Sequence, residues 1–94
     1  MAKLLDKIAV VDIEATCWNG NAPEGMVSDI IEIGICLLDV NTGEISDNRG
    51  IIVKPERSTV SDFCTELTTI TPELVDREGI SHKEACAILR KEYQ

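Results

Sequence analysis

The stretch IAVVDIEAT, residues Ile8–Thr16, decides how the rest of the chain can be arranged. It is apolar up to an Asp-x-Glu pair, which predicts a β-strand ending in two carboxylates. Because side chains alternate along a strand, Asp12 and Glu14 share one face with Ile8 and Val10. Both faces are apolar at the start of the strand. The pattern therefore predicts a strand covered on both sides by other parts of the protein.

The spacing of Asp12 and Glu14 suits a cation. Their α-carbons would lie about 6–7 Å apart, so both side chains can reach one divalent ion or flank two. An isolated Asp-x-Glu pair is more often a pair of solvated acids at a strand end. Here the apolar run before the pair and the Gly-, Pro- and Asn-rich loop over residues 17–26 favour a metal site.

Composition limits the kinds of partner. The chain has 94 residues, enough for one small domain, and 17 acidic against nine basic residues give a net charge of −8. This charge argues against a broad phosphate-binding surface, but it allows a nucleic acid end to be held through bound metal ions. There is no apolar run of membrane-spanning length and no signal-peptide pattern, so we expect a cytoplasmic protein that makes no membrane contact.

The cysteines and the single histidine show no metal-site spacing. No C-x-x-C pair occurs, and His82 is not placed among the cysteines as a zinc ligand would be. We therefore expect reduced thiols, with Cys36 and Cys86 in the core because they lie in apolar patterns. His82 falls in the first turn of an expected helix, and we expect a surface residue without a catalytic role.

Two further strands follow the first. Residues 28–40 are rich in isoleucine and predict a strand with Ile31, Ile33 and Ile35 on one face. Glu32 interrupts the other face and requires hydrogen-bond donors or a cation if it is buried. The turn NTGE at residues 41–44 is short, so residues 45–54 should return as an antiparallel, more polar edge strand.

The remainder of the chain predicts three short helices, each preceded by a residue that can cap it. The caps are Ser61, Thr71 followed by Pro72, and Ser81 with Glu84 three residues later. The second helix should end near Gly79. The apolar face of the last helix consists of Ala85, Ile88 and Leu89.

Four stretches in order along the chain carry a family resemblance. They are VVDIEATCW at Val10–Trp18, PEG at Pro23–Gly25, IIEIG at Ile30–Gly34 and FCTELTTIT at Phe63–Thr71. The first resembles the first motif of the DEDD superfamily of 3′–5′ exonucleases. Together the four are similar to the DEDDh branch that includes the Eri1-type, histone-mRNA 3′-end and KapD-like exonucleases.

This resemblance implies a fold and an activity. The implied fold is the α/β ribonuclease-H-like exonuclease fold, here a partial one of three antiparallel strands followed by short helices. Residues 1–94 would form the N-terminal part of a single exonuclease domain. The implied enzyme is a hydrolase that uses two Mg²⁺ or Mn²⁺ ions in its complete domain. It removes nucleoside 5′-monophosphates from the 3′ ends of single-stranded RNA or DNA, with RNA favoured.

The resemblance also assigns roles to residues. Asp12 and Glu14 match the first two catalytic, metal-binding acids. Glu32 matches a structural acid in the second strand. The residues that match substrate-binding positions are Ala15 and Thr16, next to the 3′-terminal nucleotide, and Leu67, Thr68 and Ile70, which pack against the terminal sugar and base.

The chain departs from the family by carrying only the first catalytic motif. The family's two later acids and its catalytic histidine have no match here, so we expect the isolated chain to be nearly inactive. We also expect the unpaired edge of the strand Ile8–Ala15 to invite pairing with a second copy of the chain. The alternatives are a catalytically inactive module that binds nucleic acid or protein, and an acidic interaction domain unrelated to nucleases.

Overall fold

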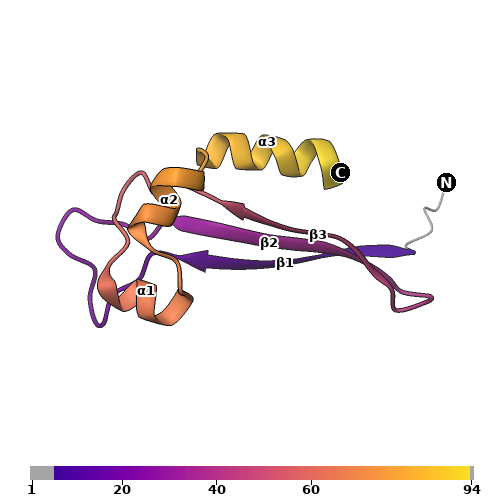
Figure 1. Cartoon of the computed structure of the whole chain (residues 1–94), viewed down its shortest axis with the longest axis horizontal. Coiled ribbons are helices and arrows are strands. Elements are labelled where there is room, and N and C mark those ends of the chain that lie inside the picture. Colours follow the sequence, from indigo (N-terminus) through magenta and orange to yellow (C-terminus); the bar gives the residue numbers. More distant parts are fainter. Residues whose placement is uncertain (1–5, 94) are drawn as a thin grey trace.

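The computed structural model describes residues 6–93, which form one antiparallel sheet and three helices (Figure 1). The elements in chain order are β1 (Lys7–Ala15), β2 (Ile30–Asp39), β3 (Ile45–Ile52), α1 (Asp62–Thr68), α2 (Pro72–Glu78) and α3 (His82–Tyr93). The strands lie in the order β1-β2-β3. The expected α/β arrangement of three antiparallel strands followed by short helices is confirmed.

The hairpin between β2 and β3 forms where the turn chemistry predicts it. The Asp39 carboxylate accepts hydrogen bonds from the backbone N–H groups of Asn41 and Thr42, at 2.9 and 3.2 Å. Gly43 follows with a φ of 75°, a conformation that glycine adopts without steric cost. These contacts reverse the chain within a few residues and bring β3 back beside β2.

The helix caps expected from the sequence are all present. The hydroxyl of Ser61 accepts a hydrogen bond from the backbone N–H of Cys64, and that of Thr71 from Leu74. Ser81 and Glu84 form the reciprocal capping box at α3. None of the helices in residues 6–93 is both long and apolar enough to cross a membrane.

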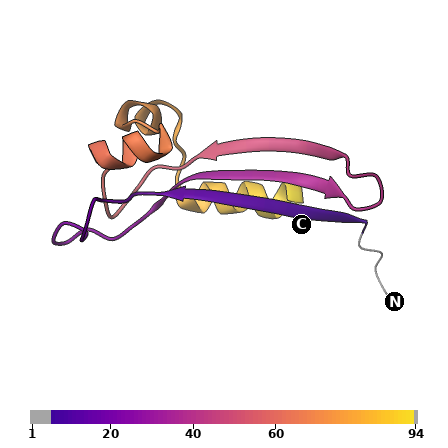
Figure 2. The same ribbon diagram turned by 90° about the horizontal axis from the view of Figure 1, so that it is seen from below.

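Helix α3 covers one face of the sheet, as Figure 2 shows. Its Ala85 is fully buried against Ile33, Ile51 and Val53, with Ile88 and Leu89 packed beside them. A second cluster forms where α1 and α2 meet the end of the sheet. Its buried members are Ile31, Val60, Cys64, Ile70 and Val75. The buried apolar residues therefore form two small clusters, one under α3 and one under α1 and α2.

Ile31 and Ile33 lie on the same buried face of β2, as expected, but they join different clusters. Ile33 belongs to the α3 cluster and Ile31 to the cluster of α1 and α2. The pairing of β1 with β2 shifts register between Glu14 and Ala15, so that Ala15 faces Ile30. Burial along β2 nevertheless alternates without a break through Ile31, Ile33 and Ile35, so the shift leaves this face of the strand continuous.

The prediction that β1 is covered on both faces is wrong for this structure. Its residues Ile8, Val10, Val11 and Ile13 are 47–53% exposed. The physical reason is that α3 packs over β2 and β3, while β1 forms one edge of the sheet. The expected unpaired edge is therefore present, and it is flanked by apolar side chains.

The cysteines are also distributed differently from the expectation. Cys36 and Cys86 are only partly buried, whereas Cys64 is fully buried. Cys36 lies opposite Val10 on the sheet face that α3 leaves open, and this explains its exposure. Cys64 is on the side of α1 that packs against the end of the sheet.

Candidate active site

The two carboxylates singled out in the sequence lie near the end of β1, on the sheet face that α3 does not cover. Strand alternation puts Asp12 and Glu14 on the same side. Asp12 is opposite Gly34, which is itself opposite Gly50 on β3. The row across the sheet beside Asp12 therefore has no side chains. The two glycines form a shelf next to Asp12, and the Glu32 carboxylate reaches over its Gly50 end.

Glu14 is directly opposite Glu32 on β2. Two like charges in such a cross-strand pair repel each other. The Glu32 side chain extends toward β3, where its Oε2 atom is 3.6 Å from the place that a β-carbon on Gly50 would occupy. The Glu32 carboxylate thus lies over a glycine of β3, which relieves the repulsion and fits the structural role expected for it.

Neither Asp12 nor Glu14 is neutralised by a basic side chain in the part of the chain that the structure describes. The ion pairs there are Arg49–Glu92, Arg57–Asp29 and Arg77–Glu78. The arrangement thus meets the condition that the metal-site hypothesis requires, namely two carboxylates on one face with no cation already bound to them.

The chain just beyond the carboxylates is fixed by Thr16, whose side chain is 1% exposed. Its backbone N–H donates to the Asp29 carbonyl at 2.8 Å, and the Asp29 N–H donates to the Thr16 hydroxyl, also at 2.8 Å. The Ser28 hydroxyl donates to the Thr16 carbonyl at 2.7 Å. The end of β1 is therefore tied to the segment that leads into β2.

Helix α1 is attached to the same segment. The Ser61 hydroxyl donates to the Cys17 carbonyl at 2.7 Å, and the Cys64 thiol donates to the Ala15 carbonyl at 3.6 Å. These contacts place α1 beside the end of β1, so that Leu67 and Thr68 are carried by an element that is bonded to the residues following Glu14.

The five predicted substrate-binding residues have different exposures. Leu67 is 69% exposed and Ala15 is partly exposed, whereas Ile70 is 3% exposed within the core. The Thr68 hydroxyl donates to the Cys64 carbonyl and accepts from the Ile70 N–H. Thr16 and Ile70 are therefore buried as whole residues, and their backbone N–H groups are already bonded within the protein. Substrate binding by all five stays a prediction.

Asp29 is a structural member of the site that sequence reasoning missed. Partial burial raises the pKa of its carboxyl, but hydrogen bonds from the Ser58 hydroxyl and from the backbone and guanidinium N–H groups of Arg57 outweigh this, so its pKa lies below the ordinary value. Only the Ser-Asp pair before the isoleucine run could have indicated it, as donor and acceptor groups placed where a buried strand begins.

Cys17 lies beside the carboxylates but stays a thiol at neutral pH. Burial raises its pKa, and the neighbouring Cys64 and the negative charge of Glu14 raise it further. Because metal binding by cysteine requires the thiolate, Cys17 is a poor candidate for a ligand.

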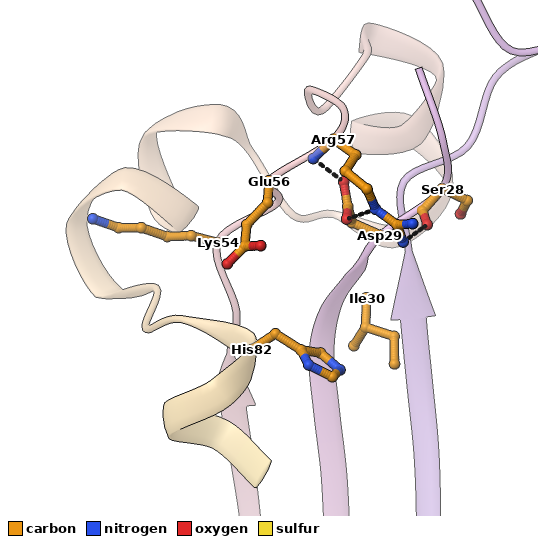
Figure 3. A pocket seen from close by; sticks show the side chains of 7 residues that line it. All are labelled: Ser28, Asp29, Ile30, Lys54, Glu56, Arg57 and His82. Carbon is orange, nitrogen blue, oxygen red and sulfur yellow. Dashed lines mark hydrogen bonds and ion pairs between the residues drawn. The ribbon is translucent and has the colours of Figure 1, made fainter. Parts of the chain in front are cut away.

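A pocket lies elsewhere in the described residues (Figure 3). This pocket of about 470 Å³ is lined by Ser28, Asp29, Ile30, Lys54, Glu56, Arg57 and His82. Ile30 packs in the α3 cluster and His82 is the first residue of α3, so the pocket lies on the α3 side of the sheet. The candidate active site is thus an open surface. His82 is exposed, as expected. Its Nδ1 atom lies 3.8 Å from the Cys86 sulfur.

The donor set fits a hard divalent ion only in part. Carboxylate oxygens suit Mg²⁺ and Mn²⁺. In residues 6–93, however, no group of three or more His, Cys, Asp and Glu side chains is placed to hold a metal ion. Asp12 and Glu14 can therefore supply only some of the oxygen ligands that a divalent ion needs.

Comparison with solved structures identifies the fold class. The chain superimposes with a TM-score of 0.81 and 40% identity on the nuclease domain of 3′hExo, a DEDDh family member bound to rAMP, covering 92% of this chain and 42% of that one. A second structure shows 3′-end specific recognition of histone mRNA stem-loop by 3′-exonuclease. It matches with a TM-score of 0.77 and 37% identity, covering 99% of this chain and 43% of that one. The fold is that of the ribonuclease-H-like DEDDh nuclease domains.

Comparison of sequences identifies the family. Residues 9–91 match the family described as Exonuclease, and the chain belongs to this family. Human 3′-5′ exoribonuclease 1 is 49% identical over 73 residues, which are 77% of this chain and 21% of that protein. Human ERI1 exoribonuclease 2 is 39% identical over 82 residues, which are 86% of this chain and 12% of that protein. The chain thus spans about a fifth or less of these relatives.

Replacing Asp29 by Asn should destabilise the protein at neutral pH by about 1.5–3 kcal/mol, because charge-assisted hydrogen bonds are lost. Since the folded-state pKa is lowered, the carboxylate stabilises the fold above its unfolded pKa, and this stabilisation disappears as the pH falls through the folded pKa. Urea unfolding at several pH values measures the effect.

The exposed Asp76 on α2 gives the control, Asp76→Asn. We expect its free energy of unfolding to change by about 0.5 kcal/mol or less. The free energy of unfolding of the wild type should fall as the pH is lowered from 5, and that of Asp29→Asn should fall less. If the two proteins lose stability equally over this range, the Asp29 carboxylate does not stabilise the fold.

Proposed function

We propose that this chain carries the first catalytic motif of a metal-dependent 3′–5′ exonuclease that acts on single-stranded 3′ ends, with RNA as its substrate. Asp12 and Glu14 are the catalytic, metal-binding acids. Leu67, Thr68, Ile70, Ala15 and Thr16 form the surface for the terminal nucleotide. The location that goes with this function is the cytoplasm.

The observation that carries the proposal is the unneutralised carboxylate pair beside the glycine shelf of Gly34 and Gly50. Two acids on one strand face, with space beside them and no basic partner in residues 6–93, form a surface that attracts cations. The family membership and the relatives named 3′-5′ exoribonuclease support RNA over DNA as the substrate.

Asp12 and Glu14 would hold the divalent ions, which when bound supply Lewis-acid stabilisation of charge on a phosphodiester and a reactive water. The protein's own part is positioning. The hydrogen bonds of Thr16 and Ser61 hold the end of β1 and α1 together, so that the carboxylates and Leu67 keep a fixed relation. Rigid support of this kind is what a site needs to align a substrate.

Binding of Mn²⁺ to the 94-residue chain tests the metal site. We expect weak binding by calorimetry, because two carboxylates alone make an incomplete shell. Asp12→Asn and Glu14→Gln should each weaken binding about tenfold or more, whereas Asp76→Asn should leave it unchanged. If all three variants bind Mn²⁺ as the wild type does, Asp12 and Glu14 do not form the metal site.

A labelled single-stranded RNA with Mn²⁺ tests the activity. Relative to the nuclease domain of human 3′-5′ exoribonuclease 1, we expect release of nucleoside 5′-monophosphates to be slower by a factor of about 10² or more, because no third ligand is placed in residues 6–93. Asp12→Asn should abolish the remainder. Cleavage that is internal, or unaffected by Asp12→Asn, would contradict the proposal.

The inactive binding module is kept as the second candidate, because the described donor set is incomplete. It predicts RNA binding, measured by fluorescence anisotropy, with no release of mononucleotide even at high enzyme concentration. Residual release that depends on Asp12 favours the exonuclease, and binding without release favours the module.

We further propose that the free edge of β1 pairs with a second copy of this chain. The edge is flanked by half-exposed apolar residues, and such edges recruit other strands. Sedimentation velocity should show a dimer or larger species that Val11→Lys shifts toward the monomer. Val27→Lys, at a position 50% exposed and away from β1, is the matched control. A stable monomer of the wild type at high concentration would refute this pairing.

A further inference from the structure

Two of the four cysteines lie next to each other at the junction of β1 and α1. Cys17 is the second residue after β1 and is partly exposed, whereas Cys64 lies within α1 and is fully buried. Cys17 packs against the cluster of apolar residues that contains Cys64, and the Cys64 side chain is a hydrogen-bond partner of the Cys17 thiol. The two residues are 47 positions apart in sequence, so their contact is a product of the fold.

One hydroxyl group bridges the backbones of the two cysteines. The Ser61 Oγ donates a hydrogen bond to the Cys17 carbonyl at 2.7 Å and accepts one from the Cys64 N–H at 3.0 Å. The Cys64 thiol is directed at the Ala15 carbonyl, two residues before Cys17, at 3.6 Å. These contacts fix the backbones of the two cysteines relative to each other, on either side of one hydroxyl group.

We propose that Cys17 and Cys64 form an oxidative cross-linking site, which a low-molecular-weight disulfide such as oxidised glutathione converts to an intramolecular disulfide. The site takes thiol oxidants as its reactants and joins α1 covalently to the end of β1. It is independent of the nuclease function, because it rests only on the contact between these two residues.

The chemistry balances with glutathione disulfide as the oxidant. The attacking group is the thiolate of Cys17, the more exposed of the two, which is a minor species at neutral pH because the pKa of Cys17 is raised. It attacks the glutathione disulfide, breaks its S–S bond and releases one glutathione thiolate. Cys64 then loses its proton and its sulfur attacks the Cys17 sulfur of the mixed disulfide, releasing the second glutathione. Two protein thiols are oxidised, and one glutathione disulfide is reduced to two thiols.

The other two cysteines have a different fate. Cys36 lies on the open sheet face and Cys86 on α3, beside the imidazole of His82. Neither has a described cysteine packed against it, so an oxidant can add to them only as a mixed disulfide. They are therefore built-in controls for the specificity of the cross-link.

The experiment treats the folded 94-residue chain with oxidised glutathione and maps the products by mass spectrometry. Cys36→Ser is used as background, because trypsin leaves residues 17 and 36 in one peptide, 8–49. We expect peptide 8–49 joined to peptide 58–77, with the linked pair lighter by two hydrogens than the two reduced peptides together. Cys86 should appear in peptide 84–90 with glutathione attached. The oxidised chain should also melt on the order of 10 °C higher than the reduced chain.

Cys17→Ser and Cys64→Ser should each abolish the cross-link, whereas Cys86→Ser should leave it in place. If Cys64→Ser fails to fold, Cys17→Ser at the partly exposed position decides the matter. Glutathione that remains attached to Cys17 without cross-linking would overturn the proposal. An internal cross-link that joins Cys86 to Cys17 or Cys64, or a melting temperature unchanged by oxidation, would overturn it as well.

Discussion

The hydrogen bonds of Thr16 are the constraint on which the rest of the structure depends. A strand that ends in two carboxylates has to be followed by chain that is held firmly, or the carboxylates have no fixed position. Thr16 is 1% exposed, and its N–H, carbonyl and hydroxyl groups are all bonded to Ser28, Asp29 or Ser58. Buried polar groups that are fully paired specify one arrangement, because any slip would leave them without partners.

The same constraint determines where α1 lies. Ser61 caps α1 through the Cys64 N–H and also donates to the Cys17 carbonyl, just beyond Thr16. One residue thus begins the helix and attaches it to the end of β1. This explains how a helix of only seven residues, too short to be stable alone, holds a defined place beside the carboxylates.

Local signals in the sequence predicted most of the fold. The caps at Ser61, Thr71 and Ser81, the turn at residues 41–44 and the pairing of the hairpin depend on neighbouring residues, and all are present. The burial of β1 was mispredicted because an apolar pattern indicates only that a strand can be covered. Whether another element covers it depends on the rest of the fold. Ile31 and Ile33 share a strand face but belong to different clusters, because different helices pack over them, and the position of those helices has no local signature.

The part of the candidate site that depends on local spacing could be predicted from the sequence, and the part that depends on tertiary contacts could not. Strand alternation alone puts Asp12 and Glu14 on one face, so the pair could be identified from its spacing. Asp29 could not, because its role comes from partners at positions 57 and 58 that only the fold brings near. The inward orientation of Thr16 and Ile70 also follows from tertiary packing, which the motif resemblance does not contain.

Two shortfalls of the described structure coincide on β1. Its apolar residues are half-exposed along a free edge, and its two carboxylates lack the further ligands that a divalent ion requires. A strand laid against that edge would bury the apolar side chains and could bring oxygen ligands to the same face. The chain spans less than half of the related nuclease structures, which therefore have the length to provide such an element. The apolar side chains and the two carboxylates of β1 therefore both meet solvent at the same edge of the sheet.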